Sequence, residues 1–247
     1  MDTIHLEKMT WKMVEEAIAN GYKTVVMAVG SIEQHGHHLP LATDTYLGDV
    51  LATRIAEKLG KTLVAPTIRP GCSEHHMTFP GTISISPELL IELLKEVCFS
   101  LDQHGFENII MIPSHGGNFG PVGVAVQSIA SQLNANLMAV TDLMGLIRVM
   151  KEGIIAIGRH PDAAGGHAGA GETSIILAYK PELVRTDMWK KGYIGPFTSK
   201  YVREGFKAVT PTGVLGDPMV GTAEAGEIII DKASDMMVEA IKKELEL

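Results

Sequence analysis

The chain has 247 residues, 45% of them hydrophobic and 20% charged, a composition that is ordinary for a globular protein. Its formal net charge of −8 and the lack of a lysine or arginine run argue against nucleic acid as a partner. The chain start lacks the pattern of a signal peptide, no apolar stretch reaches the about 18 residues of a membrane helix, and two cysteines make no disulfide framework. We therefore expect a cytoplasmic protein with no membrane partner.

Helices and strands are predicted to alternate along the chain. Continuous β-rich runs indicate strands that are covered on both faces, and apolar residues at helical spacing, bounded by glycine or by a capping residue such as Ser86, indicate helices. In chain order, the prediction is helix Thr10–Asn20, strand Thr24–Val29, helix Thr45–Lys58, strand Thr62–Ala65, helix Ser86–Gly105, strand Asn108–Ile112, helix Val122–Leu133, strand Leu137–Thr141, helix Glu172–Tyr179 and helix Thr222–Glu246.

This alternation predicts an α/β fold with a largely parallel sheet and helices on both of its faces. We treat residues 1–247 as a single domain, because no linker or repeat interrupts the pattern. The region from Thr186 to Asp217 is rich in glycine, proline and aromatic residues and fits no element, so we expect an excursion that forms an interface or a lid. Ligands of such sheets bind outside the carboxyl ends of the strands.

Ten histidines stand out, and several follow predicted strands. After the first strand, Glu33 and His35 point to the same side if the chain is still extended, and Asp44 follows at the start of a helix. Carboxylate and imidazole groups from one junction are typical of a mixed oxygen and nitrogen metal site. The alternatives are a helix-capping role for Asp44 and a solvated loop acid at Glu33.

Two further stretches have the same character. His115 follows a buried strand and precedes two glycines, which either bring the backbone close to a ligand or form an anion cradle at a helix N-terminus. The second reading would make the protein a nucleotide binder. A glycine-rich loop then delivers His167 and Glu172; Glu172 could also simply favour the first turn of its helix, whereas His167 is a candidate catalytic group.

A fourth stretch, Gly71 to Thr82, contains Cys72 with His75 and His76 close behind. A thiol nucleophile needs a base, and either histidine could serve as one. The alternative is that Cys72 packs as a small hydrophobic residue.

Four of these segments together resemble the signature of the creatininase (creatinine amidohydrolase) family. They occur in the order of the family and span about Gly30 to Ser174. The matching segments are Gly30-Ser-Ile-Glu-Gln-His-Gly36 with Leu39-Pro-Leu41 and Thr43-Asp44, Phe79-Pro-Gly-Thr82, Ser114-His-Gly-Gly-Asn118, and His167-Ala-Gly169 with Glu172-Thr-Ser174.

The resemblance implies a three-layer α/β/α sandwich, commonly assembled as a homo-oligomer, namely a hexamer, that binds two divalent metal ions per subunit. Zn, Mn and Fe all suit such a donor set. His167 would be the catalytic acid and base, and Ser73, Gly117 and Asn118 are candidate substrate-binding residues. The implied metal ligands are Glu33, His35, Asp44, His115 and Glu172, with Asp44 shared by both ions.

The implied activity is that of an amidohydrolase in which two metal ions activate water for attack on a small-molecule substrate, a cyclic amide, a formamide or a related carbonyl compound. Creatinine itself is not expected, because Gly117 stands where creatinine-hydrolysing members have a metal-binding glutamate, and the chain has only two tryptophans, Trp11 and Trp189, to surround a flat ring. The alternatives are a hydrolase that opens an oxidised cyclitol ring of the diketo-inositol type, and a non-catalytic metal-dependent binding subunit.

Overall fold

The computed structural model describes residues 3–195 and 199–246, and these form a parallel four-stranded sheet. The strand order is β2-β1-β3-β4, and every neighbouring pair is parallel. The predicted strands are all present, close to their predicted bounds: β1 (Thr24–Val29), β2 (Thr62–Val64), β3 (Asn108–Pro113) and β4 (Asn136–Ala139).

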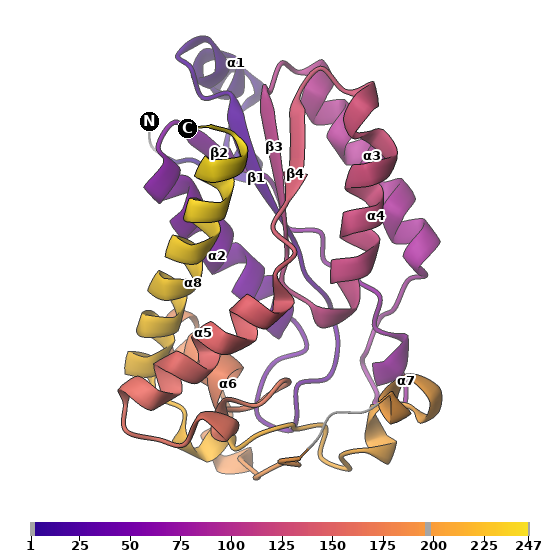
Figure 1. Cartoon of the computed structure of the whole chain (residues 1–247), viewed down its shortest axis with the longest axis vertical. Helices are drawn as coiled ribbons and strands as arrows, with labels where there is room; N and C mark the ends of the chain where they lie inside the picture. Colours follow the sequence, from indigo (N-terminus) through magenta and orange to yellow (C-terminus); the bar gives the residue numbers. More distant parts are fainter. Residues whose placement is uncertain (1–2, 196–198, 247) are drawn as a thin grey trace.

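Helices cover both faces of the sheet, so the α/β/α layering is confirmed (Figure 1). Alternate residues of β1 divide between two cores, with Val26 and Ala28 in one and Val25 and Met27 in the other. The first core is closed by α2 (Thr43–Leu59), α5 (Leu143–Ala156), α6 (Ala170–Tyr179) and α8 (Ala223–Glu244). The second is closed by α1 (Trp11–Ala19), α3 (Pro87–Gln103) and α4 (Phe119–Ile129).

The strand order creates a crevice between the carboxyl ends of β1 and β3. From β1 the chain passes through α2 to β2 on one side, and then returns through α3 to β3 on the other side of β1. Parallel crossovers are right-handed, and the crossovers from β1 to β2 and from β2 to β3 run in opposite directions along the sheet. The helices in these crossovers, α2 and α3, therefore lie on opposite faces. The connections after β1 and β3 therefore diverge, and this is the place where sheets of this kind bind ligands.

The local structure differs from the sequence prediction at the start of α2. The helix begins at Thr43 rather than Thr45, and Ala42 occupies the N-cap without a side-chain hydrogen bond. Asp44 is therefore in the first turn, and the interpretation of this residue as a helix cap is wrong. Its carboxylate is free to point into the crevice.

Helix α5 was absent from the prediction. Its N-cap Asp142 accepts a hydrogen bond from the Gly145 backbone N–H, and Leu146, Val149 and Met150 pack into the first core. The region 186–217, which fitted no element, contains short 3₁₀ turns and α7 (Lys200–Glu204) within its described residues. In Figure 1 the described parts of this segment, drawn in orange, lie at the carboxyl end of the sheet.

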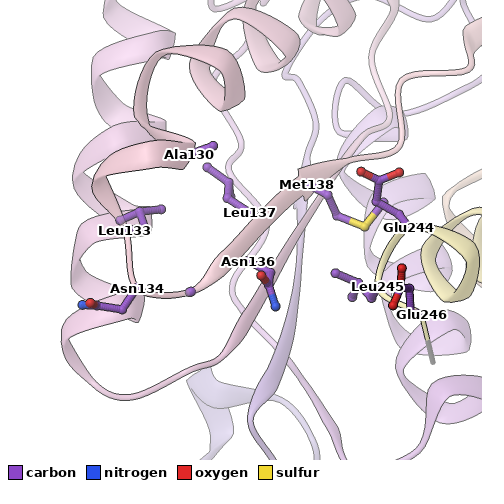
Figure 2. Close-up of a pocket in the computed structure, with 10 residues that line it drawn as sticks. Ala130, Leu133, Asn134, Asn136, Leu137, Met138, Glu244, Leu245 and Glu246 are labelled. Carbon is purple, nitrogen blue, oxygen red and sulfur yellow. The ribbon is translucent and has the colours of Figure 1, made fainter.

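A hollow of about 510 Å³ lies at the opposite, amino end of β4, where the end of α8 approaches (Figure 2). Its described lining residues include Glu244 and Glu246 but neither histidine nor cysteine, so it does not offer the mixed donor set found in the crevice. No helix among the described residues is long and apolar enough to cross a membrane.

Candidate metal centre

The five predicted ligands converge in the crevice from four different parts of the chain. Glu33 and His35 lie in the loop after β1, Asp44 in the first turn of α2, His115 directly after β3, and Glu172 in the first turn of α6. The first four are buried, and the side chain of Glu172 is only 13% exposed. Three carboxylates buried in one place require cationic partners, because an isolated buried charge is very costly.

The donor atoms of these residues form two groups that meet at Asp44. In one group, His115 Nδ1 lies 3.2 Å from Glu33 Oε2 and 3.0 Å from Asp44 Oδ2. Two atoms that bind one ion at about 2.1 Å each, at the tetrahedral angle, are about 3.4 Å apart. The spacing of this group therefore suits a single cation.

The second group uses the other oxygen of Asp44. His35 Nε2 lies 3.2 Å from Asp44 Oδ1 and 3.7 Å from Glu172 Oε2. Because one carboxylate oxygen faces each group, Asp44 can bridge two cations, as the sequence comparison with the family predicted.

Hydrogen bonds with the surrounding chain orient the two histidines. His35 Nδ1 donates to the Glu33 carbonyl oxygen at 3.1 Å, and His115 Nε2 donates to the Cys72 carbonyl oxygen at 3.1 Å. Each ring therefore turns its other nitrogen toward the carboxylates, where this nitrogen can bind a cation once it has lost its proton. Two lone pairs facing carboxylate oxygens repel them unless a cation or a proton lies between.

The electrostatics of the cluster indicate the same need for cations. Burial alone would lower the pKa of His35, but the carboxylates of Asp44, Glu172 and Glu33 raise this pKa to about 10. Burial alone would also lower the pKa of His115, but the carboxylates of Glu33 and Asp44 outweigh burial and raise this pKa. In addition, Glu33 Oε2 has no hydrogen-bond partner among the described residues. Divalent ions would satisfy both the lone pairs and this oxygen, so the residues present fit such ions.

The carboxylates are held from outside the cluster as well. Ser31 Oγ donates to Asp44 Oδ2 at 2.8 Å, and Ser114 Oγ donates to the Asp44 backbone carbonyl at 2.8 Å. The backbone N–H of Ala168 donates to Glu172 Oε2 at 2.5 Å. Ala168 adopts φ 52°, a left-handed conformation that costs energy for a residue with a Cβ and that recurs at functional sites.

His167 lies beside the cluster, at the wall of a cavity of about 960 Å³. Its Nε2 is 2.7 Å from the carbonyl oxygen of Gln34, and its Nδ1 is 3.8 Å from Glu33 Oε1. Burial and the neighbouring His35 lower the pKa of His167, which favours a neutral ring. A neutral ring that donates from Nε2 presents a basic Nδ1 to the centre, as a proton-transfer group requires.

Two residues beside the cluster, Gln34 and His76, could not be assigned to this site from the sequence. His76 Nε2 lies 3.3 Å from Glu33 Oε1, and Gln34 Nε2 lies 2.8 Å from His76 Nδ1. Sequence reasoning considered His76 only as a base for Cys72. Burial raises the pKa of the Cys72 thiol, which disfavours a thiolate nucleophile.

The predicted substrate-binding residues have different surroundings. Gly117 lines the cavity, and a Cβ there would lie 2.3 Å from the Cys72 carbonyl oxygen, so this chain has no room for a glutamate at that position without a shift. Ser73 is buried, with Oγ 3.4 Å from His115 Nε2. Asn118 is buried and links the end of β1 to the Cys72 loop. Its Nδ2 donates to the carbonyl oxygens of Val29 and Gly30, and its Oδ1 accepts a hydrogen bond from the Cys72 backbone N–H. Substrate contacts by these residues stay predictions.

Comparison with known proteins gives consistent matches over nearly the whole chain. The sequence profile of the creatininase family, described as creatinine amidohydrolase, matches residues 7–241. The mycofactocin precursor peptide peptidase of Mycobacterium tuberculosis is 34% identical over 239 residues, which cover 89% of this chain and 85% of the peptidase. The creatinine amidohydrolase of Pseudomonas putida is 25% identical over 256 residues, which cover 98% and 97% of the two chains.

The fold agrees with these matches. A solved structure described as "Creatininase Mn" superposes with a TM-score of 0.82 at 24% identity, and the match covers 98% of this chain and 99% of that one. The family profile and the M. tuberculosis relative each span most of the sequence. The chain therefore belongs to the creatininase family.

Proposed function

We propose that this protein is a hydrolase that cleaves the amide C–N bond of a small molecule with the help of two divalent metal ions, Zn, Mn or Fe. The ions would be held by Glu33, Asp44 and His115 on one side and by His35, Asp44 and Glu172 on the other. The observation that supports this most is the position of Asp44, whose two oxygens each lie 3.0–3.2 Å from a histidine nitrogen of a different group.

The chain itself would supply proton transfer and a dry environment. Bound at these positions, divalent ions act as Lewis acids on a carbonyl oxygen and lower the pKa of water at the site. His167 Nδ1 would take a proton from the water that attacks the amide carbon and would return it to the nitrogen that departs when the C–N bond breaks, as a general base and then a general acid. Phe206 packs against His167, with ring centroids 4.8 Å apart, and restricts the access of bulk water to this ring.

The lining of the cavity favours an amide other than creatinine. Helix α5 contributes Met144, Ile147 and Met150, and the segment 193–206 contributes Tyr193 and Tyr201. Neither tryptophan is among the described residues that line the cavity: Trp11 is 76% exposed on α1, and Trp189 packs against a separate apolar cluster. This lining suits an elongated substrate with apolar groups, such as a formamide with a large substituent or a short peptide.

We expect hydrolysis to require metal ions, and we expect the substrates to be amides other than creatinine. Dialysis against a chelator should abolish hydrolysis, and added Mn²⁺ or Zn²⁺ should restore it, because the donor cluster is otherwise uncompensated. The measurement is elemental analysis of the purified protein followed by a screen of creatinine, cyclic amides, formamides and short peptides. Full activity of a metal-free preparation would contradict the proposal, and rapid creatinine turnover would contradict the substrate class.

We also propose that a single domain, residues 1–247, assembles as a homo-oligomer, namely a hexamer as the family resemblance implies. Large apolar side chains stand exposed on several elements, among them Trp11 on α1, Leu89 on α3 and Met219, at 76%, 57% and 57% exposure. Exposed apolar groups of this size mark interaction surfaces when they are contiguous. Sedimentation equilibrium should give a mass several times that of the chain, and a monomeric mass at micromolar concentration would contradict the assembly.

A further inference from the structure

The buried side chain of Gln34 lies between two histidines of the centre, and its orientation is fixed. Its Oε1 accepts a hydrogen bond from the Gly36 backbone N–H at 2.9 Å. Its Nε2 then lies 2.8 Å from His76 Nδ1 and 3.3 Å from the Gly213 carbonyl oxygen. A flipped amide would turn its NH₂ group toward an N–H donor and its oxygen toward a carbonyl. Gln34 Nε2 also lies 3.0 Å from Nε2 of the second histidine, His167, whose proton goes to the Gln34 backbone carbonyl oxygen. The hydrogen bonds with Gly36 and Gly213 set the orientation of the amide.

This orientation determines where His76 holds its proton. Because the Gln34 amide donates to His76 Nδ1, that nitrogen is an unprotonated acceptor, and the proton of the neutral ring is on Nε2. With this proton on Nε2, His76 presents a donor 3.3 Å from Glu33 Oε1. The packing holds the ring in this plane, since Phe206 stacks on it at 4.4 Å with an interplanar angle of 26° and the residue is only 1% exposed.

The consequence falls on Glu33. Its Oε1 lies 3.3 Å from His76 Nε2, whereas its Oε2 has no hydrogen-bond partner among the described residues and faces His115 Nδ1 at 3.2 Å. The two oxygens of the Glu33 carboxylate therefore have different neighbours, the proton-bearing Nε2 of His76 beside Oε1 and the ligand candidate His115 beside Oε2. Without that donor, the carboxylate could rotate about its last bond and exchange them.

We propose that His76 is a positioning residue for the metal centre: it holds Glu33 Oε1 so that Oε2 is directed at a cation, and Gln34 sets the tautomer that this task requires. The inference rests on the proposed metal centre and assigns a role to a residue outside its ligand set. Outer-shell partners of metal ligands typically contribute about 10–100-fold to metal affinity.

Two substitutions of His76 separate its hydrogen bond from its ring. His76→Phe keeps an aromatic ring against Phe206 but has no donor, whereas the amide nitrogen of His76→Gln can reach the position of the imidazole Nε2. We expect titration calorimetry with Mn²⁺ to give a Kd about 10–100-fold higher for His76→Phe and a Kd close to that of the unsubstituted protein for His76→Gln. His37→Phe, which changes an exposed histidine in the loop after β1, is the matched control and should leave the Kd unchanged.

Nuclear magnetic resonance of protein labelled with ¹⁵N at histidine tests the tautomer without metal. The ring signal that His76→Gln removes should show an unprotonated Nδ1 and a protonated Nε2, and this reading remains available should His76→Phe fail to fold. The opposite tautomer, a charged ring, or equal Mn²⁺ affinity in the unsubstituted and His76→Phe proteins would overturn the inference alone. Absence of any Mn²⁺ binding to the unsubstituted protein would overturn the proposed function together with it.

Discussion

Replacing Asp44 with alanine is expected to remove both metal ions and to abolish hydrolysis. One oxygen of this carboxylate faces His115 and the other faces His35, so a single substitution takes a donor from each group. Metal ions contribute several kcal/mol of transition-state stabilisation, which corresponds to a loss of activity of about a thousandfold or more. The measurements are the metal content by elemental analysis and the rate on any amide that the unsubstituted protein hydrolyses.

The matched control for this prediction is Glu57→Ala, which removes an exposed acid from the same helix α2. It should retain both ions and full activity. An Asp44→Ala protein that keeps two ions per chain would contradict the bridging role of Asp44, and one that keeps a single ion would show that the two groups are independent.

Replacing His167 with alanine is expected to lower kcat by about 100- to 10,000-fold, the contribution of a positioned acid and base, while both ions stay bound. The expectation follows from the position of Nδ1, which lies 3.8 Å from Glu33 Oε1, beside the two donor groups proposed to hold the ions. The measurement is steady-state kinetics together with metal content. This combination distinguishes proton transfer from ligation.

His160→Ala serves as the control, because the side chain of His160 is 77% exposed and lies outside the described lining of the cavity. It should leave kcat and metal content unchanged. Loss of metal in His167→Ala would make His167 a ligand rather than a catalytic group, and an unchanged kcat would place proton transfer elsewhere.

Much of the fold could be predicted because the strands are continuous apolar runs. β1 and β3 are buried on both faces, so their sequences contain little else, and their ends are clear. Helix α5 was missed because its first turns, Leu143-Met-Gly-Leu-Ile, follow β4 with almost uniform apolar character and a glycine in the first turn. The start of α2 was misplaced because its cap, Ala42, makes no side-chain hydrogen bond that a sequence pattern could signal.

The ligand candidates could be identified because each follows a strand or opens a helix, where the parallel topology brings distant residues together. Gln34 and His76 gave no such signal. Strand alternation predicts that Gln34 points away from Glu33, but the chain turns after β1, so that its amide reaches both His76 and the Gly213 carbonyl. Contacts that depend on a turn in one loop and on a second loop 42 residues away have no local periodicity.

Position 117 and Glu172 differ in the room that each has for a side chain directed at the proposed centre. A side chain at position 117 would collide with the Cys72 carbonyl and with His115 Nε2, at 2.3 and 2.6 Å from the Cβ. Glu172 approaches the second donor group from α6 instead and is oriented by the Ala168 N–H. The third carboxylate of the proposed centre is therefore the one that α6 supplies.

The most direct test of the metal centre is anomalous X-ray diffraction from crystals grown with Mn²⁺ or Zn²⁺. We expect two neighbouring anomalous peaks with Asp44 between them, one beside Glu33 and His115 and the other beside His35 and Glu172. A diffraction map in which these five side chains surround no anomalous density, at a metal concentration that supports hydrolysis, would contradict this expectation.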